Sequence, residues 1–230
     1  PDNYQEEPLG IEARRTSPTN IGLAMLSCLG AYDIGFIDEQ RLFFLIGKTL
    51  DTIEKLEKWN GHLLNWYSTE TLQPLRPAFV STVDNGNFIA MLSALKNGLS
   101  AMENESAERL SCRLAKILST TDFSLLYDER KDLFFIGYDC EKKAYAEGHY
   151  DLYAGEALTT SYYSVAKRQV PYRHWQKLAK YTVSRGGCFY VKSWTGTMFE
   201  YFMPKILLPN YGGSFSDEML RGVVKQQMKR

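Results

Sequence analysis

The sequence lacks the short motifs by which several common enzyme classes are found. It has no glycine-rich phosphate loop, no G-x-S-x-G elbow and no H-E-x-x-H motif. These absences argue against nucleotide binding, serine-hydrolase chemistry and zinc proteolysis. Cys28, Cys112, Cys140 and Cys188 form no C-x-x-C pair, and no histidine stands at zinc-finger spacing from them. We therefore expect no metal and no cofactor, and thiols that stay reduced in a cytoplasmic compartment.

A surplus of one charge and long apolar runs are also missing. Lys and Arg number 27, as do Asp and Glu, so no basic excess predicts a nucleic-acid partner. No apolar run approaches the roughly 18 residues that a membrane-spanning helix needs. The opening PDNYQEEP is acidic and polar, unlike a signal peptide. Aromatic residues are plentiful instead, at 13% of 230 residues, and serve as core or, less commonly, as platforms for a flat apolar ligand face.

Apolar periodicity predicts about seven helices and a single β-hairpin. The longer helices are expected over residues 17–35, 38–58, 88–99, 106–118, 150–167 and 216–229. The hairpin is expected over residues 123–138, around the charged turn DERKD. Residues 60–86 have three chain breakers and no helical period, which is typical of a long functional loop. The polar start without Met and the end within a helix indicate a piece of a longer protein.

Three clusters of polar and aromatic residues are candidates for ligand binding. The first lies at the start of the first helix, where free N–H groups and a guanidinium favour oxygen ligands, although N-capping alone explains it equally well. The second combines aromatic rings, which can stack on a sugar, with polar side chains, which can form hydrogen bonds to its hydroxyl groups. One of its members, Asp84, is equally well explained as a helix cap. The third surrounds Glu156, whose neighbours in sequence are typical of a buried position. A buried carboxyl is either paired or has a raised pKa, and its role is either functional or only to fix helix packing. The clusters consist of Arg15, Thr16, Ser17 and Asn20; of His62, Asn65, Trp66, Tyr67, Asp84, Asn85 and Asn87; and of Tyr150, Asp151, Glu156, Tyr162 and Tyr163.

Glu200 is the fourth candidate, because it carries the only charge between Trp194 and Pro204. Its neighbours in sequence, Phe199 and Tyr201, are aromatic. Desolvation by such neighbours raises the pKa of a carboxyl above its usual value of about 4.3. A carboxyl with a raised pKa is suited to act as a general acid, so we expect a catalytic role for Glu200.

Several segments together resemble one known family. They are DNYQEEP, RTSPTNIGLAMLSCLGAYDIGFI, GHLLNWYSTETLQPLRPAFVSTVDNGNF, LFFIGYD, HYDLYAGEA, VPYRHW and SWTGTMFEYFMP. In this order they are similar to the glucoamylase-like domain of bacterial cyclic β-1,2-glucan synthases. The match extends over nearly the whole chain and is least clear over residues 97–111, where the family carries a longer helical insert.

The resemblance implies a fold and an activity. The fold would be a mostly α, partial (α/α)6 toroid, with residues 1–230 as the N-terminal half or more of a glucoamylase-like domain cut from a longer chain. The activity would be cleavage of linear β-1,2-glucan and its transfer into a ring, by a retaining mechanism that needs two carboxyl groups about 5–5.5 Å apart. Glu200 matches a family carboxylate, as the acid or less readily the nucleophile, and the second carboxylate is expected beyond Arg230. This fragment would then be inactive alone.

The same resemblance implies binding residues and partners. Matching positions that we expect to bind or support the sugar are Arg15, Asn20, Trp66, Asp84, Tyr150, Asp151, Glu156 and Trp194. The partners would be β-1,2-glucan or its oligosaccharides and the remainder of the same polypeptide, without nucleic acid or a membrane span in this segment. The domain would lie in the cytoplasm, within a larger protein associated with the inner membrane. An endo-β-1,2-glucanase and a non-catalytic glucan-binding or scaffold module are the alternatives.

Three structural expectations follow from these assignments. The start of the first helix, the 60–86 segment, the region of Tyr150 and Glu200 should converge around one concavity. Half a toroid should leave an uncovered apolar groove or associate with another chain. Glu200 should have a raised pKa.

Overall fold

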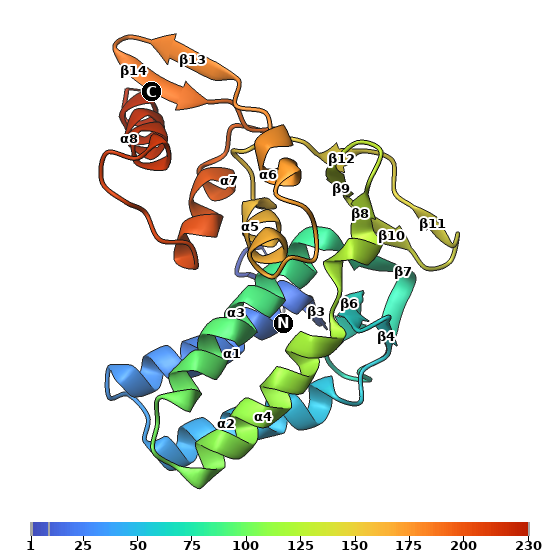
Figure 1. The fold of residues 1–230 in the computed structure, drawn as a ribbon. Helices are drawn as coiled ribbons and strands as arrows, with labels where there is room; N and C mark the ends of the chain where they lie inside the picture. Colours follow the sequence, from blue (N-terminus) through green and yellow to red (C-terminus); the bar gives the residue numbers. More distant parts are fainter. Residues whose placement is uncertain (1, 9, 230) are drawn as a thin grey trace.

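The computed structural model describes residues 2–8 and 10–229, which form a helical bundle flanked by small sheets (Figure 1). Eight α-helices and two short 3-10 helices occur in these residues. The α-helices are α1 (Pro18–Asp33), α2 (Glu39–Ile53), α3 (Thr82–Ser100), α4 (Glu105–Thr120), α5 (Leu158–Ala166), α6 (Arg173–Lys177), α7 (Met198–Phe202) and α8 (Phe215–Gln227). The 3-10 helices are η1 (Phe123–Leu126) and η2 (Met203–Ile206).

Fourteen short strands in the described part of the chain form five sheets. The largest sheet has the order β11-β10-β7-β6-β3, and another has the order β12-β9-β8. These two consist of β3 (Arg15–Thr16), β6 (Asn65–Ser68), β7 (Pro74–Ser81), β10 (Gly137–Asp139) and β11 (Ala144–Tyr145), and of β8 (Tyr127–Asp128), β9 (Leu133–Phe135) and β12 (His149–Tyr150). The remaining sheets are pairs: β1 (Asn3–Gln5) with β2 (Ile11–Ala13), β4 (Lys58–Trp59) with β5 (His62–Leu63), and β13 (Thr182–Arg185) with β14 (Cys188–Val191).

The expected fold class, a mostly α partial (α/α)6 toroid with one hairpin, is therefore wrong. The hairpin around DERKD exists as β8 and β9, but it is one part of a larger β-structure. Strand β7 pairs with β6 on one side and with the distant β10 on the other. Because such pairing joins segments about 60 residues apart, the apolar period of either segment alone does not reveal it.

Local capping signals in the sequence are reproduced at two helix starts. The side chain of Ser17 accepts a hydrogen bond from the Asn20 N–H at the start of α1, and that of Asp38 accepts one from the Arg41 N–H at the start of α2. The cap of α3 is Ser81, whose side chain accepts from the Asp84 N–H. Asp84 is thus not the cap, and its carboxylate in the first turn of α3 is available for another role.

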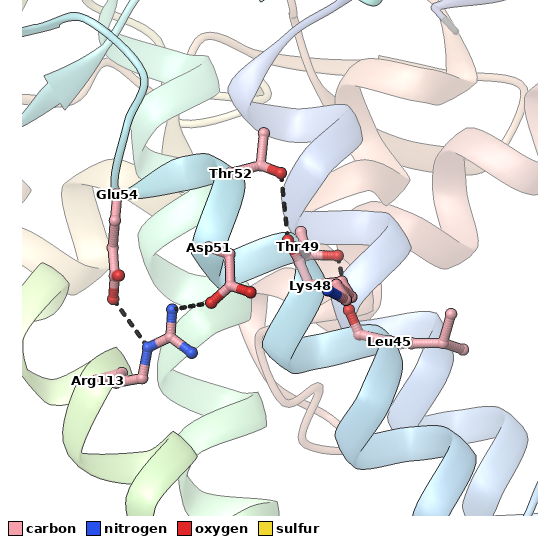
Figure 2. A network of polar contacts seen from close by, with 7 residues as sticks. All are labelled: Leu45, Lys48, Thr49, Asp51, Thr52, Glu54 and Arg113. Carbon is pink, nitrogen blue, oxygen red and sulfur yellow. Dashed lines mark hydrogen bonds and ion pairs between the residues drawn. The ribbon is translucent and has the colours of Figure 1, made fainter.

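The helical layer packs α1 against α3 and α2 against α4 (Figure 1). Gly22 allows the first contact, because a Cβ there would lie 3.2 Å from the Phe88 Cα. Arg113 on α4 ties that helix to the end of α2 (Figure 2). Its Nη2 donates to Asp51 at 2.8 Å, and its Nε donates to Glu54 at 2.9 Å. The hydrogen bond from Arg113 holds the pKa of Glu54 below its usual value.

The described apolar side chains gather in two cores. The larger core lies among α1 to α5 and the adjoining strands, and it contains fully buried Leu42, Ile46, Leu92 and Phe123. A smaller core joins the elements after residue 133 and includes Leu178, Val191, Tyr201, Met219, Leu220 and Val223. Figure 1 shows α7, α8 and the β13–β14 pair to one side of the bundle. The site described below lies where residues of these two parts meet.

The helix expected over residues 150–167 begins later than the sequence indicates. Tyr150 lies in β12, where it pairs with Phe134, and α5 starts only at Leu158. The intervening segment, which contains Asp151 and Glu156, is irregular. The apolar residues there face a core without belonging to a helix, which explains the wrong boundary.

An apolar groove of about 250 Å³ lies on the surface between α5 and α6. Tyr162, Tyr172 and Trp175 line it, and Tyr172 is 63% exposed. An open apolar groove is therefore present, while the expectation that it is the uncovered face of a half toroid stays a prediction. Among the described helices, none has the length and apolar character needed to cross a membrane.

The burial of His174 on α6 leads us to expect that the folded state loses stability at acidic pH. Its ring is fully buried, with Nδ1 2.9 Å from the Asp132 carbonyl and Nε2 2.9 Å from Ser161 Oγ. Burial lowers the pKa of His174 below the ordinary value of 6.5, and it also lowers the pKa of His62. The unfolded chain therefore takes up protons at a higher pH than the folded chain does. The free energy of unfolding should be nearly constant above about pH 6.5 and fall as the pH is lowered from there.

Urea unfolding at pH 7.5, 6.5 and 5.5 measures this effect. His174→Gln keeps a neutral polar side chain and should lose part of the pH dependence. An unchanged pH dependence in that variant would contradict the assignment to His174.

Candidate active site

Two carboxyl groups face one small hollow, here called the carboxylate hollow. Its lining consists of Tyr150, Leu152, Ala154, Gly155, Glu156, Ala157, Trp194 and Glu200. Its volume is about 20 Å³, which is room for about one water molecule. Any ligand larger than a few atoms therefore has to lie across its mouth rather than inside it.

Glu200 is held by hydroxyl and amide donors from the residues just before it. Its Oε2 accepts hydrogen bonds from Ser193 Oγ at 2.8 Å, from Thr195 Oγ1 at 2.7 Å and from the Thr197 N–H at 3.2 Å. The Thr195 N–H also donates to this carboxylate. The bond to Thr197 is part of a capping box at the start of α7.

The expectation of a raised pKa for Glu200 is wrong. Burial alone would raise the pKa of this carboxyl, but the hydrogen bonds from Thr195, Ser193 and Thr197 outweigh it and hold the pKa below its usual value. The aromatic neighbours do not enclose the carboxylate, since Phe199 is 57% exposed and Tyr201 turns into the smaller core. Glu200 is therefore ionised at neutral pH.

Glu156 has the opposite electrostatic character. Desolvation raises the pKa of its carboxyl, and the negative charges of Asp84 and Glu200 raise it further. The same surroundings affect Tyr150, whose pKa is raised by burial and by the charges of Glu156 and Asp84. The surroundings of the hollow thus raise the pKa of one carboxyl and lower the pKa of the other, the arrangement that separates acid and base roles.

An aromatic ledge borders the carboxylate hollow. The rings of Tyr150 and Trp194 are stacked, with centroids 5.1 Å apart and an interplanar angle of 13°. The indole Nε1 of Trp194 donates to Asp151 Oδ1 at 3.1 Å. Trp194 remains 49% exposed, so Asp151 and Tyr150 hold in place a ring that still has surface for a ligand.

A second, wider hollow of about 490 Å³, here called the Trp66 hollow, lies beside the largest sheet. It is lined by Arg15, Asn65, Trp66, Leu75, Arg76, Pro77, Phe79, Ser81 and Asp84. Strands β3 and β6 pair directly, and this places the Arg15 guanidinium over the Trp66 ring, 4.6 Å from its centroid. Asp84 accepts a hydrogen bond from Asn65 Nδ2 at 3.0 Å.

Asp84 connects the two hollows. It lines the Trp66 hollow, while its charge acts on Tyr150 and Glu156 in the carboxylate hollow. The four regions named from the sequence therefore meet around one surface. Asn20 lines neither hollow, and its side chain bonds to Asp2 rather than to the other expected binding residues.

Sequence reasoning missed the residues that set the state of Glu200. These are Ser193, Thr195 and Thr197. Thr197-x-x-Glu200 fits the Ser/Thr-x-x-Glu pattern of a capping box, and that pattern would have indicated a hydrogen-bonded, ionised carboxylate. Asn65, which orients Asp84, was named only as one member of a cluster.

A third hollow, of about 430 Å³, lies between α3, α4 and α5 and differs chemically from these two. Lys96, Asn97, Lys167 and Gln169 are among its lining residues, and none of the lining residues is acidic. It is therefore not a place for carboxylate chemistry. Within residues 2–8 and 10–229, no group of three His, Cys, Asp or Glu side chains is placed to hold a metal ion.

Comparison with known proteins finds one curated relative and several solved structures of similar fold. No family model matches the chain. Over 352 residues the chain is 26% identical to cyclic β-(1,2)-glucan synthase NdvB of Rhizobium meliloti (strain 1021), a match that covers 99% of this chain and 12% of the relative. The resemblance to cyclic β-1,2-glucan synthases that the motifs indicated is confirmed.

Solved structures agree on the fold. A candidate glucoamylase of Bacteroides fragilis NCTC 9343 superposes with a TM-score of 0.79 at 14% identity, over 97% of this chain and 58% of that one. The chain has a glucoamylase-like fold. An endo-β-1,2-glucanase of Chitinophaga pinensis, solved with sophorotriose and glucose, gives a TM-score of 0.76 at 15% identity, over 100% of this chain and 60% of that one.

The lengths of these proteins differ greatly. This glucoamylase-like chain spans about three fifths of the two solved structures and about an eighth of the synthase. The stretch aligned with the synthase is longer than the chain itself, so the synthase carries additional residues within it.

Proposed function

We propose that this chain is part of a glycan-active domain that cleaves linear β-1,2-glucan and transfers the cut chain, closing it into a ring. The single observation that carries the proposal is the carboxylate hollow, where Glu156 and Glu200 have pKa values displaced in opposite directions beside an aromatic ledge. The similarity to a cyclic β-1,2-glucan synthase over almost the whole chain supports β-1,2-glucan as the substrate.

Glu156 is the group best suited to protonate the glycosidic oxygen. Desolvation and the negative charges of Asp84 and Glu200 raise the pKa of its carboxyl, the direction that suits a proton donor. The acid role that the sequence assigned to Glu200 thus passes to Glu156 in this proposal. Breaking the bond transfers the proton from Glu156 to the leaving oxygen, and the carboxylate that remains can later accept a proton from the incoming hydroxyl.

Glu200 stays in the proposed site as its ionised carboxylate. It raises the pKa of Glu156, and it organises the segment that carries Trp194. It is a poor nucleophile, because its Oε2 already accepts several hydrogen bonds. We therefore propose that the carboxylate that attacks the anomeric carbon lies outside these 230 residues, in the remainder of the same polypeptide, and that residues 1–230 belong to a larger glucoamylase-like domain.

The binding residues are proposed along the two hollows. Trp194 and Tyr150, held by Asp151, provide ring surface next to the cleaved bond. Arg15, Trp66 and Asp84 line the wider Trp66 hollow, where further glucose units would lie. Asn20 is proposed as a supporting residue, because it shares the Asp2 carboxylate with Arg15. We further propose that the domain lies in the cytoplasm. This location fits the four cysteines, which form no disulfide.

Product analysis of the full-length protein tests the proposal. Incubation with linear β-1,2-glucan should give cyclic products or linear products longer than the substrate. Linear β-1,4-glucan, the control, should stay intact.

The second candidate is hydrolysis, as favoured by the fold shared with an endo-β-1,2-glucanase. Short linear products alone would establish it in place of transfer. Binding without any products, measured by titration calorimetry with β-1,2-gluco-oligosaccharides, would instead establish a non-catalytic binding module.

A further inference from the structure

Asp2 joins two of the residues proposed to bind the glucan. Its Oδ1 accepts a hydrogen bond from Asn20 Nδ2 at 2.9 Å, and its Oδ2 accepts one from Arg15 Nε at 3.2 Å. The Asp2 side chain is 18% exposed, whereas that of Arg15 is 46% exposed. The carboxylate is therefore more buried than the guanidinium, and Arg15 still lines the Trp66 hollow.

The contact determines the orientation of Arg15. An arginine side chain has many rotamers, and it loses entropy when it is held in one geometry. Here the guanidinium is held by a charged acceptor at Nε while it lies over the Trp66 ring. Asp2 thus completes a layered arrangement in which Trp66 and Arg15 present a fixed flat surface to the hollow.

The fold itself gains little from this contact. Asp2 precedes the β1–β2 pair, which joins no other strand and is largely exposed. Tyr4 and Ile11 in that pair are 62% and 54% exposed. A carboxylate that fixes two site residues from a segment with so little buried surface serves the site more than the core.

We propose that Asp2 is a positioning residue of the glucan site, which fixes Arg15 against Trp66 and orients Asn20. The inference rests on the proposed function, because it assigns a purpose to residues placed in that site. Asp2 has no part in bond cleavage, so it acts on substrate affinity and not on the chemical step.

The test compares Asp2→Ala and Asp2→Asn with Glu12→Gln in the full-length protein. Glu12 lies opposite Tyr4 in the same strand pair and is exposed, so it is a matched control. We expect Asp2→Ala to raise KM for β-1,2-glucan, and Kd for its oligosaccharides, about tenfold with kcat unchanged within about twofold. Asp2→Asn, which keeps one acceptor oxygen, should be intermediate, and Glu12→Gln should behave as the unaltered protein.

Two further measurements separate positioning from a structural role. The Arg15 Nε–H resonance should shift and exchange faster in Asp2→Ala, while the melting temperature stays within about 2 °C of the unaltered protein. In a variant that already carries Arg15→Ala and Asn20→Ala, adding Asp2→Ala should change Kd less than about twofold.

Each outcome decides the inference. Unchanged affinity in Asp2→Ala, or an equal loss in Glu12→Gln together with a lower melting temperature, would overturn it. Failure of the unaltered protein to bind β-1,2-gluco-oligosaccharides would refute the proposed function instead. In that case the Arg15 resonance still decides whether Asp2 positions Arg15.

Discussion

Replacing Glu156 with glutamine should lower turnover of β-1,2-glucan by about 10²–10⁴-fold, the usual contribution of a general acid. Glutamine keeps the size of the side chain but has no transferable proton. Because Glu156 has to be protonated, the activity of the unaltered protein should fall as the pH rises through the raised pKa of Glu156. Initial rates of glucan cleavage measured between pH 4 and pH 9 would check both statements.

The leaving group provides a sharper test of the same role. A glucan derivative with an activated aryl leaving group needs little protonation, so the first release of the aryl group, measured in a single turnover, should be almost as fast in Glu156→Gln as in the unaltered protein. The later transfer step should stay slow in this variant, because it needs Glu156 as a base. Glu147→Gln, an exposed carboxyl nine residues earlier, is the control and should change neither rate. Equal losses on both substrates would show that Glu156 positions the sugar without supplying its proton.

Replacing Glu200 with glutamine should lower turnover at neutral pH by about tenfold or more, for two separable reasons. Loss of its charge removes one cause of the raised pKa of Glu156, so the basic limb of the pH–rate profile should move to lower pH. Loss of a charged acceptor oxygen weakens the hydrogen bonds from Ser193, Thr195 and Thr197, which hold the segment before α7 in place.

The second effect should also weaken binding, because the same segment carries Trp194. Fluorescence of Trp194 and the pH–rate profile report the two effects independently. A variant with an unmoved pH profile and normal turnover would exclude Glu200 from the site.

Short-range features of this protein were readable from the residue order. The caps Ser17 and Asp38 and the periodic helices that follow them depend on contacts within one or two turns, and the structure reproduces them. The turn between β8 and β9 is equally local. The low pKa of Glu200 also belongs here, since its donors lie within seven residues and Thr197-x-x-Glu200 fits the capping-box pattern. The expectation of a raised pKa took only the aromatic neighbours into account.

Other features depended on segments that only the tertiary structure brings together. Strand β7 pairs with β10, which no periodicity within either segment predicts, and this pairing overturned the mostly helical fold class. The helix expected to start at Tyr150 starts only at Leu158, for the same reason. A short apolar run that packs on a core has the same sequence pattern whether it is helical or irregular.

The properties of Glu156 show most directly what sequence cannot determine. In the chain it is one carboxyl between Gly155 and Ala157, and either a structural or a functional role fits that setting. Its raised pKa requires Asp84 and Glu200, which lie 72 residues before it and 44 residues after it, to be close enough for charge repulsion. Electrostatic interaction depends on distance in space and on the surrounding dielectric, and both are set only when the chain has folded.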